Sequence, residues 1–358
     1  MLSPTRRSFL ALGAIGGLSL LCGCTDEGDK DRKQAEDADR AVRIRAVAAT
    51  DALLASYDAV IAGPGAGQAD TLQDLREDVA QHRAALAQGL PAATGSPSPS
   101  GSGAPAASVA ALAAAERQTA AARLADLDGA SPELARLLAS VSASNAAHAA
   151  ALGDTGQVAP APAASGSPSP SAAASGPASA TGSGSGSASP SAKPSPYPSP
   201  QATALQSALA AEHAAVYGYG VVGALLPVGP QREDGRASYA AHQARRDGWQ
   251  RLLANGGVSP TAAAPGYRLP FAVKDAAGAK QLAAYIETQL TGAYVELTGT
   301  STGALRAEGA AALRETALRA VHWGAELPAL PGMPAADGAA SGAPSNPPDS
   351  TGSASPSA

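Results

Sequence analysis

Residues 201–226 read QATALQSALAAEHAAVYGYGVVGALL, and this stretch decides the fold. Its larger apolar side chains recur at helical spacings: Leu205, Leu209, Val216, Tyr219 and Leu226. Such a stripe marks the buried face of an α-helix. Glu212 fills the vacant position of the stripe, so the same helix carries an acid toward the core.

Three further helices follow before residue 330. Their stripes are Tyr239, Trp249 and Leu253, then Ala283, Leu290, Tyr294 and Leu297, and finally Leu305, Ala312 and Trp323. The connection from about Asn255 to Lys274 contains three prolines and is far longer than a usual turn between antiparallel helices. It is long enough to return along the bundle, as the single crossover of a ferritin-like bundle does. Residues 201–330 are therefore predicted to form a four-helix bundle.

Residues 36–155 repeat this plan. Four stripes recur at spacings of three and four: Ile44, Val47, Leu54 and Ile61; Leu72, Leu75, Val79 and Leu86; Val109, Leu112, Ala120 and Leu127; Leu134, Leu138, Val141 and Leu152. Ser131 and Pro132 are typical of a helix start. The longest gap, about Gly89 to Ala106, again separates the second helix from the third. We predict an all-α protein with two four-helix up-down bundles in tandem, the second ferritin-like.

The amino-acid composition indicates which segments are spacers between or beside the two bundles. Ala, Gly, Ser and Pro make up almost all of residues 156–200, with Lys193 the only charge from residue 159 on, and a similar tail covers 331–358. Such segments bury too little apolar surface to offset the entropy of ordering, so both are predicted to be disordered. Residues 24–35 are predicted to be a solvated tether. A chain with 12 aromatics among 358 residues and a net charge of −5 favours neither an α/β enzyme nor a nucleic-acid partner.

The N-terminus carries an export signal. Thr5-Arg6-Arg7-Ser8-Phe9-Leu10 resembles a twin-arginine signal, and the uncharged stretch after it is too short to span a bilayer. Leu21-Cys22-Gly23-Cys24 resembles a bacterial lipobox, although Cys22 is atypical there. We predict that residues 1–23 are removed and that Cys24 is acylated, which anchors the protein in lipid on the outer face of the cytoplasmic membrane. Secretion without an anchor is the alternative.

Polar residues on the apolar stripes are the chemical candidates. In the second bundle they are Glu212, His242, Glu287, Glu315 and His322; in the first they are Asp51, Asp58, His82, Glu116, Asn145 and His148. Ferritin-like metal carriers use two Glu-x-x-His pairs. The residues three before the histidines on these second and fourth helices are Val79, Asn145, Tyr239 and Arg319. A complete di-iron site is therefore not expected.

Two interpretations of these residues stay open. Imidazole and carboxylate together suit one iron, manganese or zinc ion, held by Glu212, His242, Glu287, Glu315 or His322, with Asp51, His82, Glu116 and His148 as a second set. Alternatively, Arg246 and Arg319 on the same faces neutralise the buried carboxylates, because an isolated buried charge costs several kcal/mol. In that case the polar side chains are paired core groups and no cofactor is needed.

A family resemblance covers residues of about 203–328. The segments Glu212-His213-Ala214-Ala215-Val216-Tyr217-Gly218-Tyr219-Gly220, Ala241-His242-Gln243-Ala244-Arg245-Arg246-Asp247 and Tyr267-Arg268-Leu269-Pro270-Phe271 carry it. They resemble the actinobacterial ferritin-like domain of unknown function numbered 4439. The resemblance implies a ferritin-like fold and no established activity.

Two functions are consistent with these features. The first is a membrane-tethered, non-enzymatic binding or scaffold protein whose protein or small-ligand partner the sequence does not identify. The alternative is a metal-dependent oxidase or metal-storage protein that is loaded before folded export. The membrane lipid is the one partner that the sequence specifies, through Cys24.

Overall fold

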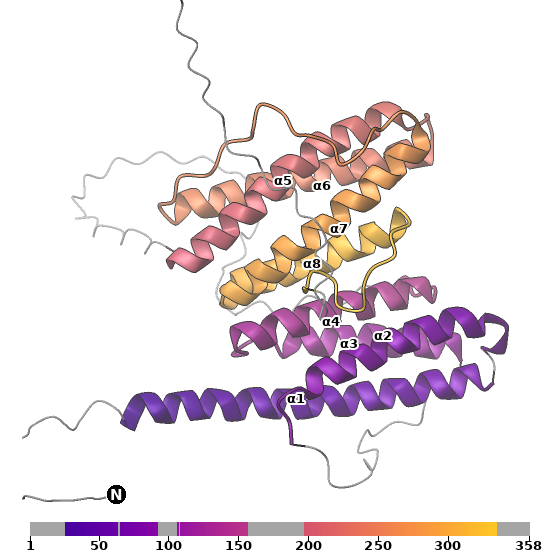
Figure 1. Ribbon diagram of the computed structural model, residues 1–358, viewed down its shortest axis with the longest axis vertical. Coiled ribbons are helices and arrows are strands. Elements are labelled where there is room, and N and C mark those ends of the chain that lie inside the picture. Colours follow the sequence, from indigo (N-terminus) through magenta and orange to yellow (C-terminus); the bar gives the residue numbers. More distant parts are fainter. Residues whose placement is uncertain (1–25, 64, 92–105, 107, 157–196, 335–358) are drawn as a thin grey trace, which may run out of the picture.

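The structure is a computed structural model that describes residues 26–63, 65–91, 106, 108–156 and 197–334 (Figure 1). These ranges contain α-helices and one short 3-10 helix, Ala66–Gln68, and no strand. The helices are α1 (Asp26–Ile61), α2 (Ala69–Ala87), α3 (Val109–Ala125), α4 (Pro132–Ala151), α5 (Ser199–Leu225), α6 (Pro230–Asn255), α7 (Ala276–Thr300) and α8 (Gly303–His322). The predicted all-α fold with two four-helix bundles is confirmed. No described helix is both long enough and apolar enough to cross a bilayer.

The two bundles share one arrangement. In the first, α1 packs on α2 and α3, and α3 packs on α4; in the second, α5 packs on α6 and α7, and α7 packs on α8. Residues 256–275 form an extended connection that runs back along the second bundle, so α6 and α7 point the same way (Figure 1). The long connection therefore acts as the crossover that its prolines and length indicated.

Side chains cap several helices at the expected places. The Ser131 hydroxyl accepts a hydrogen bond from the Leu134 backbone N–H, and Pro132 occupies the first turn of α4. Ser108 and Asp275 accept equivalent bonds at the starts of α3 and α7. Each of these oxygens satisfies one backbone donor that has no partner inside the helix.

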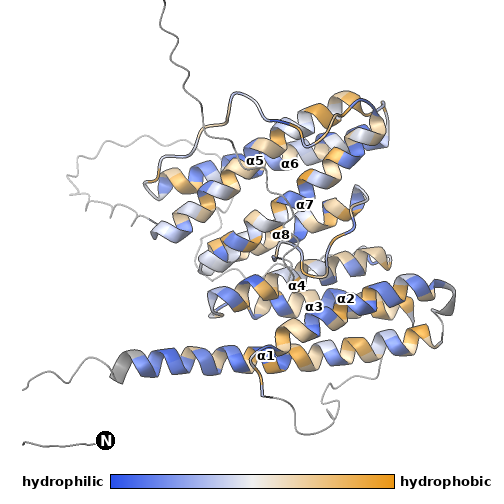
Figure 2. Ribbon diagram, in the orientation of Figure 1, coloured by the Kyte–Doolittle hydropathy of each residue, from blue (hydrophilic) through white to orange (hydrophobic). Residues whose placement is uncertain are grey.

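α1 is longer than the sequence pattern indicated. It begins at Asp26, so the segment interpreted as a tether is helical from that residue, and its side chains from Asp29 to Ala38 are exposed. This hydrophilic part of α1 extends past the other helices (Figure 2). Acidic and basic residues three or four apart, such as Arg32 with Asp29 and Lys33 with Asp37, support the helix where no tertiary contact does.

α4 lies at the centre of the molecule and joins the two bundles. Every side chain from Leu137 to Ala149 is buried, because α2 and α3 cover one side of α4 while α7 and α8 cover the other. Residues 137–153 contain no Asp, Glu, Lys or Arg, and a helix that is uncharged on all sides requires burial on all sides. The single stripe assigned to this helix from the sequence therefore described only half of its buried surface.

A C-terminal strap, residues 324–334, packs between the bundles. The Ala329 carbonyl oxygen lies 2.7 Å from His82 Nε2 of α2, and the Ser140 hydroxyl of α4 donates to the Pro331 carbonyl at 2.9 Å. Gly332 has a φ of +78°, and a Cβ there would lie 2.4 Å from the Thr291 carbonyl oxygen. The residues 331–334 that were assigned to a disordered tail thus form part of the packed structure, while the rest of that tail and most of residues 156–200 lie outside the described residues.

Arg306 of α8 donates hydrogen bonds to three backbone carbonyls, and two of these bonds connect the bundles. It is 5% exposed and donates to Ser301 at 2.7 Å, to Leu127 at 2.9 Å and to Ala130 at 2.7 Å. The last two carbonyls belong to the turn between α3 and α4 of the first bundle.

We expect Arg306→Ala to lower the free energy of unfolding by about 2–3 kcal/mol, because it leaves buried carbonyls without a charged donor. Urea denaturation of the full chain without its signal segment measures the change. Arg236→Ala, which removes an exposed arginine paired only with Glu233, is the control and should cost less than about 1 kcal/mol. Equal effects of the two substitutions would contradict the role assigned to Arg306.

Candidate functional site

The core of the second bundle contains an imidazole clamped between two carboxylates. His242 Nδ1 lies 2.8 Å from Glu212 Oε2, and His242 Nε2 lies 3.0 Å from Glu287 Oε1. All three side chains are 0% exposed and come from α6, α5 and α7. With an acceptor at each ring nitrogen, the imidazole donates two hydrogen bonds and is an imidazolium.

Tyrosine hydroxyls complete the carboxylate contacts. Tyr219 of α5 donates to Glu287 Oε1 at 2.6 Å, and Tyr294 of α7 donates to Glu212 Oε1. Burial raises the pKa of Tyr294 well above its usual value, and the nearby Glu212 raises it further. Both phenols are therefore protonated donors. The sequence indicated core rings at these positions, and the hydroxyls of these two are bonded within the core.

Two arginines balance the remaining negative charge. Arg319 Nε of α8 lies 2.9 Å from Glu287 Oε1, and Arg245 of α6 forms an ion pair with Glu315 while its Nε lies 4.0 Å from Glu212 Oε1. The three carboxylates of this network are Glu212, Glu287 and Glu315, and the three cations are His242, Arg245 and Arg319. The network is neutral as a whole, which is the condition for keeping charges inside a low-dielectric core.

The pKa directions follow from these contacts. Burial alone would lower the pKa of His242, but hydrogen bonds and charge from Glu212 and Glu287 outweigh it and raise that pKa. Burial likewise opposes ionisation of Glu287, yet His242 and Arg319 hold its pKa below the usual value. Each partner therefore stabilises the charged form of the other.

Two residues predicted for this site, His322 and Arg246, lie outside the network, and Glu315 only reaches its edge. Glu315 is on the rim, 45% exposed, where it pairs with Arg245. His322 is 57% exposed and lies 3.2 Å from Asp234. Arg246 pairs with its neighbour Asp247 and not with a buried carboxylate.

Arg245 takes the role that the sequence pattern assigned to Arg246. Positions three and four after His242 both lie near its face of α6, and helical spacing alone does not separate them. Arg319, the other predicted charge-pairing residue, lies beside Glu287.

The first bundle contains a related cluster around Glu116 of α3. The Tyr57 hydroxyl of α1 and the Asn145 amide of α4 each donate to this buried carboxylate at 2.6 Å. His148 Nδ1 lies 3.1 Å from Glu116 Oε1, and its Nε2 lies 3.4 Å from Asp78 Oδ2 of α2. An imidazole is again placed between two carboxylates. Asp78 was not predicted, although it precedes the stripe residue Val79 and lies one turn before His82.

His82 and Asp51 do not bind Glu116. His82 is fully buried and stacks on His148 with ring centroids 5.9 Å apart, while its Nε2 bonds to the strap. Its Nδ1 and Asn145 Oδ1 have no hydrogen-bond partner within the described residues. Asp51 lies near the surface with Arg83, and Asp58 pairs there with Arg76.

The two stacked histidines have opposite pKa shifts. Burial lowers the pKa of His82 to about 4, and the charge of His148 lowers it in the same direction. Burial also opposes protonation of His148, but Glu116 and Asp78 raise its pKa to about 9. One ring is therefore neutral and the other charged at pH 7.

These arrangements do not match a metal centre. Both ring nitrogens of His242 face carboxylates, and a guanidinium lies 2.9 Å from Glu287, where a metal ion would be repelled. In the part of the chain that the structure describes, no three His, Cys, Asp or Glu side chains converge to hold a metal ion. His242, Glu212 and Glu287 are bonded to one another and to protein cations, although Glu287 Oε2 has no hydrogen-bond partner within the described residues.

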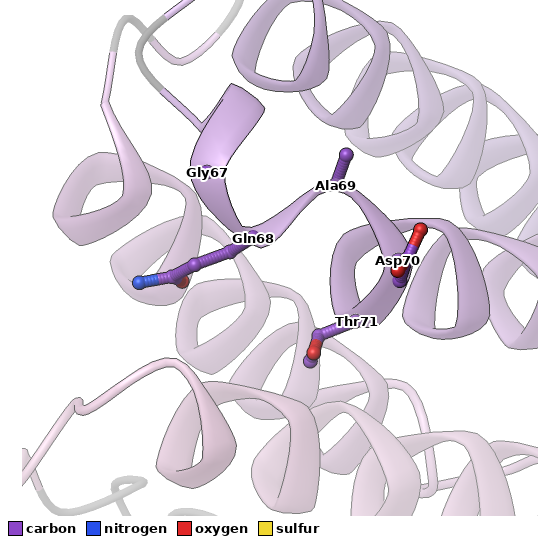
Figure 3. Close-up of a pocket in the computed structure, with 5 residues that line it drawn as sticks. All are labelled: Gly67, Gln68, Ala69, Asp70 and Thr71. Atoms are coloured by element: carbon purple, nitrogen blue, oxygen red, sulfur yellow. The ribbon is translucent and has the colours of Figure 1, made fainter.

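The turn between α1 and α2 forms a small surface pocket that carries no chemistry. Its volume is about 230 Å³, and five consecutive residues, 67–71, line it. The side chains of Gln68, Asp70 and Thr71 point in different directions (Figure 3). They do not converge on a common point, so this pocket is not a candidate site.

Residues 204–335 match a family model described as a domain of unknown function, DUF4439. This part of the chain belongs to that family. A conserved hypothetical protein from Mycobacterium tuberculosis, whose crystal structure is known, has 37% sequence identity to this chain. The match covers 36% of this chain and 96% of that chain, with a TM-score of 0.34. No curated protein matches the chain. The resemblance seen in the sequence is confirmed, and the carboxylate–imidazole network of the second bundle lies within the matched residues.

His148 should make stability depend on pH. Its pKa rises from about 6.5 in the unfolded chain to about 9 in the folded protein, so its contribution is complete below pH 6.5 and is lost as the pH rises through 9. We expect the free energy of unfolding of the wild type to exceed that of His148→Gln by on the order of 3 kcal/mol at pH 6. This difference should shrink as the pH approaches 9. Urea denaturation across this range measures it.

His322→Gln, which alters an exposed histidine, is the matched control and should cost less stability at pH 6 than His148→Gln. A difference between wild type and His148→Gln that stays constant, or grows with pH, would exclude an imidazolium at this position.

Proposed function

We propose that this protein is a non-enzymatic binding or scaffold lipoprotein, with a ferritin-like second bundle, tethered to the outer face of the cytoplasmic membrane. The first part of the proposal concerns the chemistry of the bundles, and the second concerns location. The alternative is a metal-dependent oxidase or storage protein.

One observation carries the non-enzymatic part: the buried carboxylates of the second bundle are neutralised by the protein's own cations. His242 lies between Glu212 and Glu287, and Arg319 lies against Glu287. A metal ion in this position would have to displace an imidazolium proton and lie next to a guanidinium. Both requirements oppose binding, because like charges repel strongly in a low-dielectric core.

The close packing of the two bundles supports a scaffold role. α4 is covered by helices from both bundles, Arg306 bonds across the junction, and the strap fills the remaining space. Such a body keeps its surfaces in fixed relative positions. The long α1 carries exposed side chains from Asp29 to Ala38 and leads from this end into the first bundle.

The location rests on the sequence of the N-terminus. Arg6 and Arg7 indicate export by the twin-arginine route, which carries folded proteins, and Cys24 is the predicted acylation site. The helical start of α1 lies two residues after that cysteine. The anchor would therefore connect to the body through a helix.

Elemental analysis tests the chemistry. We expect the purified chain, produced without its signal segment and exposed to excess Fe²⁺, Mn²⁺ or Zn²⁺ before desalting, to retain well under one metal ion per molecule. Glu287→Gln should leave the metal content unchanged but lower stability by about 3–5 kcal/mol, since it removes one member of a buried charged network. One equivalent of bound metal that Glu287→Gln abolishes would establish the alternative function.

Fractionation of cells tests the location. Wild-type protein should sediment with membranes and incorporate a labelled fatty acid, whereas Cys24→Ser should lose the label and appear in the soluble fraction. Cys22→Ser is the matched control and should stay lipidated and membrane-bound. Unlabelled wild-type protein in the soluble fraction would contradict the anchor.

A further inference from the structure

A groove between α6 and α8 has a volume of about 580 Å³, larger than that of the pocket lined by residues 67–71. It is lined by Ala241, Ala244, Arg245, Gly248, Trp249, Arg251, Leu252 and Asn255 of α6 and by Glu308 of α8. This volume lies within the range of about 300–1,000 Å³ typical of small-molecule sites. None of these residues except Arg245 takes part in the buried network described above.

Ion pairs connect α6 and α8 beyond the groove. Arg245 reaches Glu315, and Asp234 reaches His322, across the space between the two helices. On the groove side α6 presents the small residues Ala241, Ala244 and Gly248. A Cβ placed on Gly248 would have only Arg251 Nη2 near it, at 4.0 Å, so the space beside this glycine is open.

Uncommitted hydrogen-bond donors line this apolar groove. Trp249 is 2% exposed, and its indole N–H has no acceptor in the described part of the protein. Arg251 is exposed and forms no ion pair with any described residue, and the Asn255 side chain is likewise unbonded there. Arg251 and Asn255 are therefore the donors of the lining that an acceptor in the groove can reach.

We propose that this groove binds a small apolar molecule that carries one carboxylate. The small residues, Leu252 and the Trp249 ring accommodate the apolar body, and Arg251 pairs with the carboxylate, while Asn255 supplies a neutral donor. Glu308 is the one acidic side chain in the lining and excludes a second negative charge from the α8 wall. This proposal deepens the proposed binding function by naming a ligand class, and it rests on that function.

Tryptophan fluorescence provides the test, because the chain has only two tryptophans. In a Trp323→Phe background, the emission of Trp249 reports on the groove alone. The probes are decanoate, below its micellar concentration, and the uncharged decanamide. We expect decanoate to change the emission saturably and to bind about tenfold more tightly than decanamide, since a charged hydrogen bond is roughly twice as strong as a neutral one.

Substitutions locate the site. Arg251→Gln should weaken decanoate binding about tenfold and leave decanamide binding unchanged, because only the ion pair is lost. Arg236→Gln, an exposed arginine on the same helix that pairs with Glu233, is the matched control and should change neither. Gly248→Leu should abolish binding of both probes, while circular dichroism verifies that each variant stays folded.

The proposal is overturned if decanoate causes no saturable change, or if Arg251→Gln and Arg236→Gln affect it equally. The outcome is separable from that of the metal analysis. If the protein is metal-free and does not bind decanoate, the proposed non-enzymatic role stands and the proposed ligand class is wrong. If the protein holds one equivalent of metal and still binds decanoate, the non-enzymatic role is wrong and the ligand class stands.

Discussion

A carboxylate in the middle of a helix bundle has to be neutralised, and this requirement organises the interior of both bundles. Each bundle uses an imidazolium with a carboxylate on either side: His242 between Glu212 and Glu287, and His148 between Glu116 and Asp78. Burial opposes every one of these charges separately. Held together, each charge raises the stability of the next, so the set is favourable only as a unit.

The two bundles place their core polar groups in a similar layout, although the residues at matching positions differ. A tyrosine from the first helix donates to a glutamate on the third in both bundles, Tyr57 to Glu116 and Tyr219 to Glu287. Seven residues before these tyrosines stand Thr50 and Glu212, both buried. The first bundle thus lacks the second core glutamate and also lacks an arginine on its cluster among the described residues. Its second carboxylate, Asp78 of α2, is 28% exposed, so water solvates the charge that no guanidinium balances.

The sequence predicted the helices well, because stripes of large apolar residues such as Leu205 and Leu209 depend only on helical periodicity. It also predicted that Glu212, His242 and Glu287 come together, because each fills a gap in its apolar stripe. Two features were beyond that reasoning. Whether Arg245 or Arg246 reaches the core depends on the rotation of α6 about its axis, and whether Glu315 points into the core or to its rim depends on the rotation of α8. Both are set by packing between helices, which a single stripe does not specify.

The same limitation explains why the contact between the two bundles was not predicted. A stripe of large apolar residues shows that a helix has one buried face. Small residues outside the stripe do not indicate whether they are buried or exposed. In α4, Ala and Ser fill the positions beside Leu134 and Leu138, and only the absence of charge from residue 137 to 153 distinguishes a central helix from a peripheral one. Because these small side chains allow α7 and α8 to approach closely, each bundle supplies part of the other's core. The outer surfaces of both bundles, including the groove beside α6, therefore belong to a single rigid unit, and a ligand bound at one of them would be held at a fixed position relative to α1.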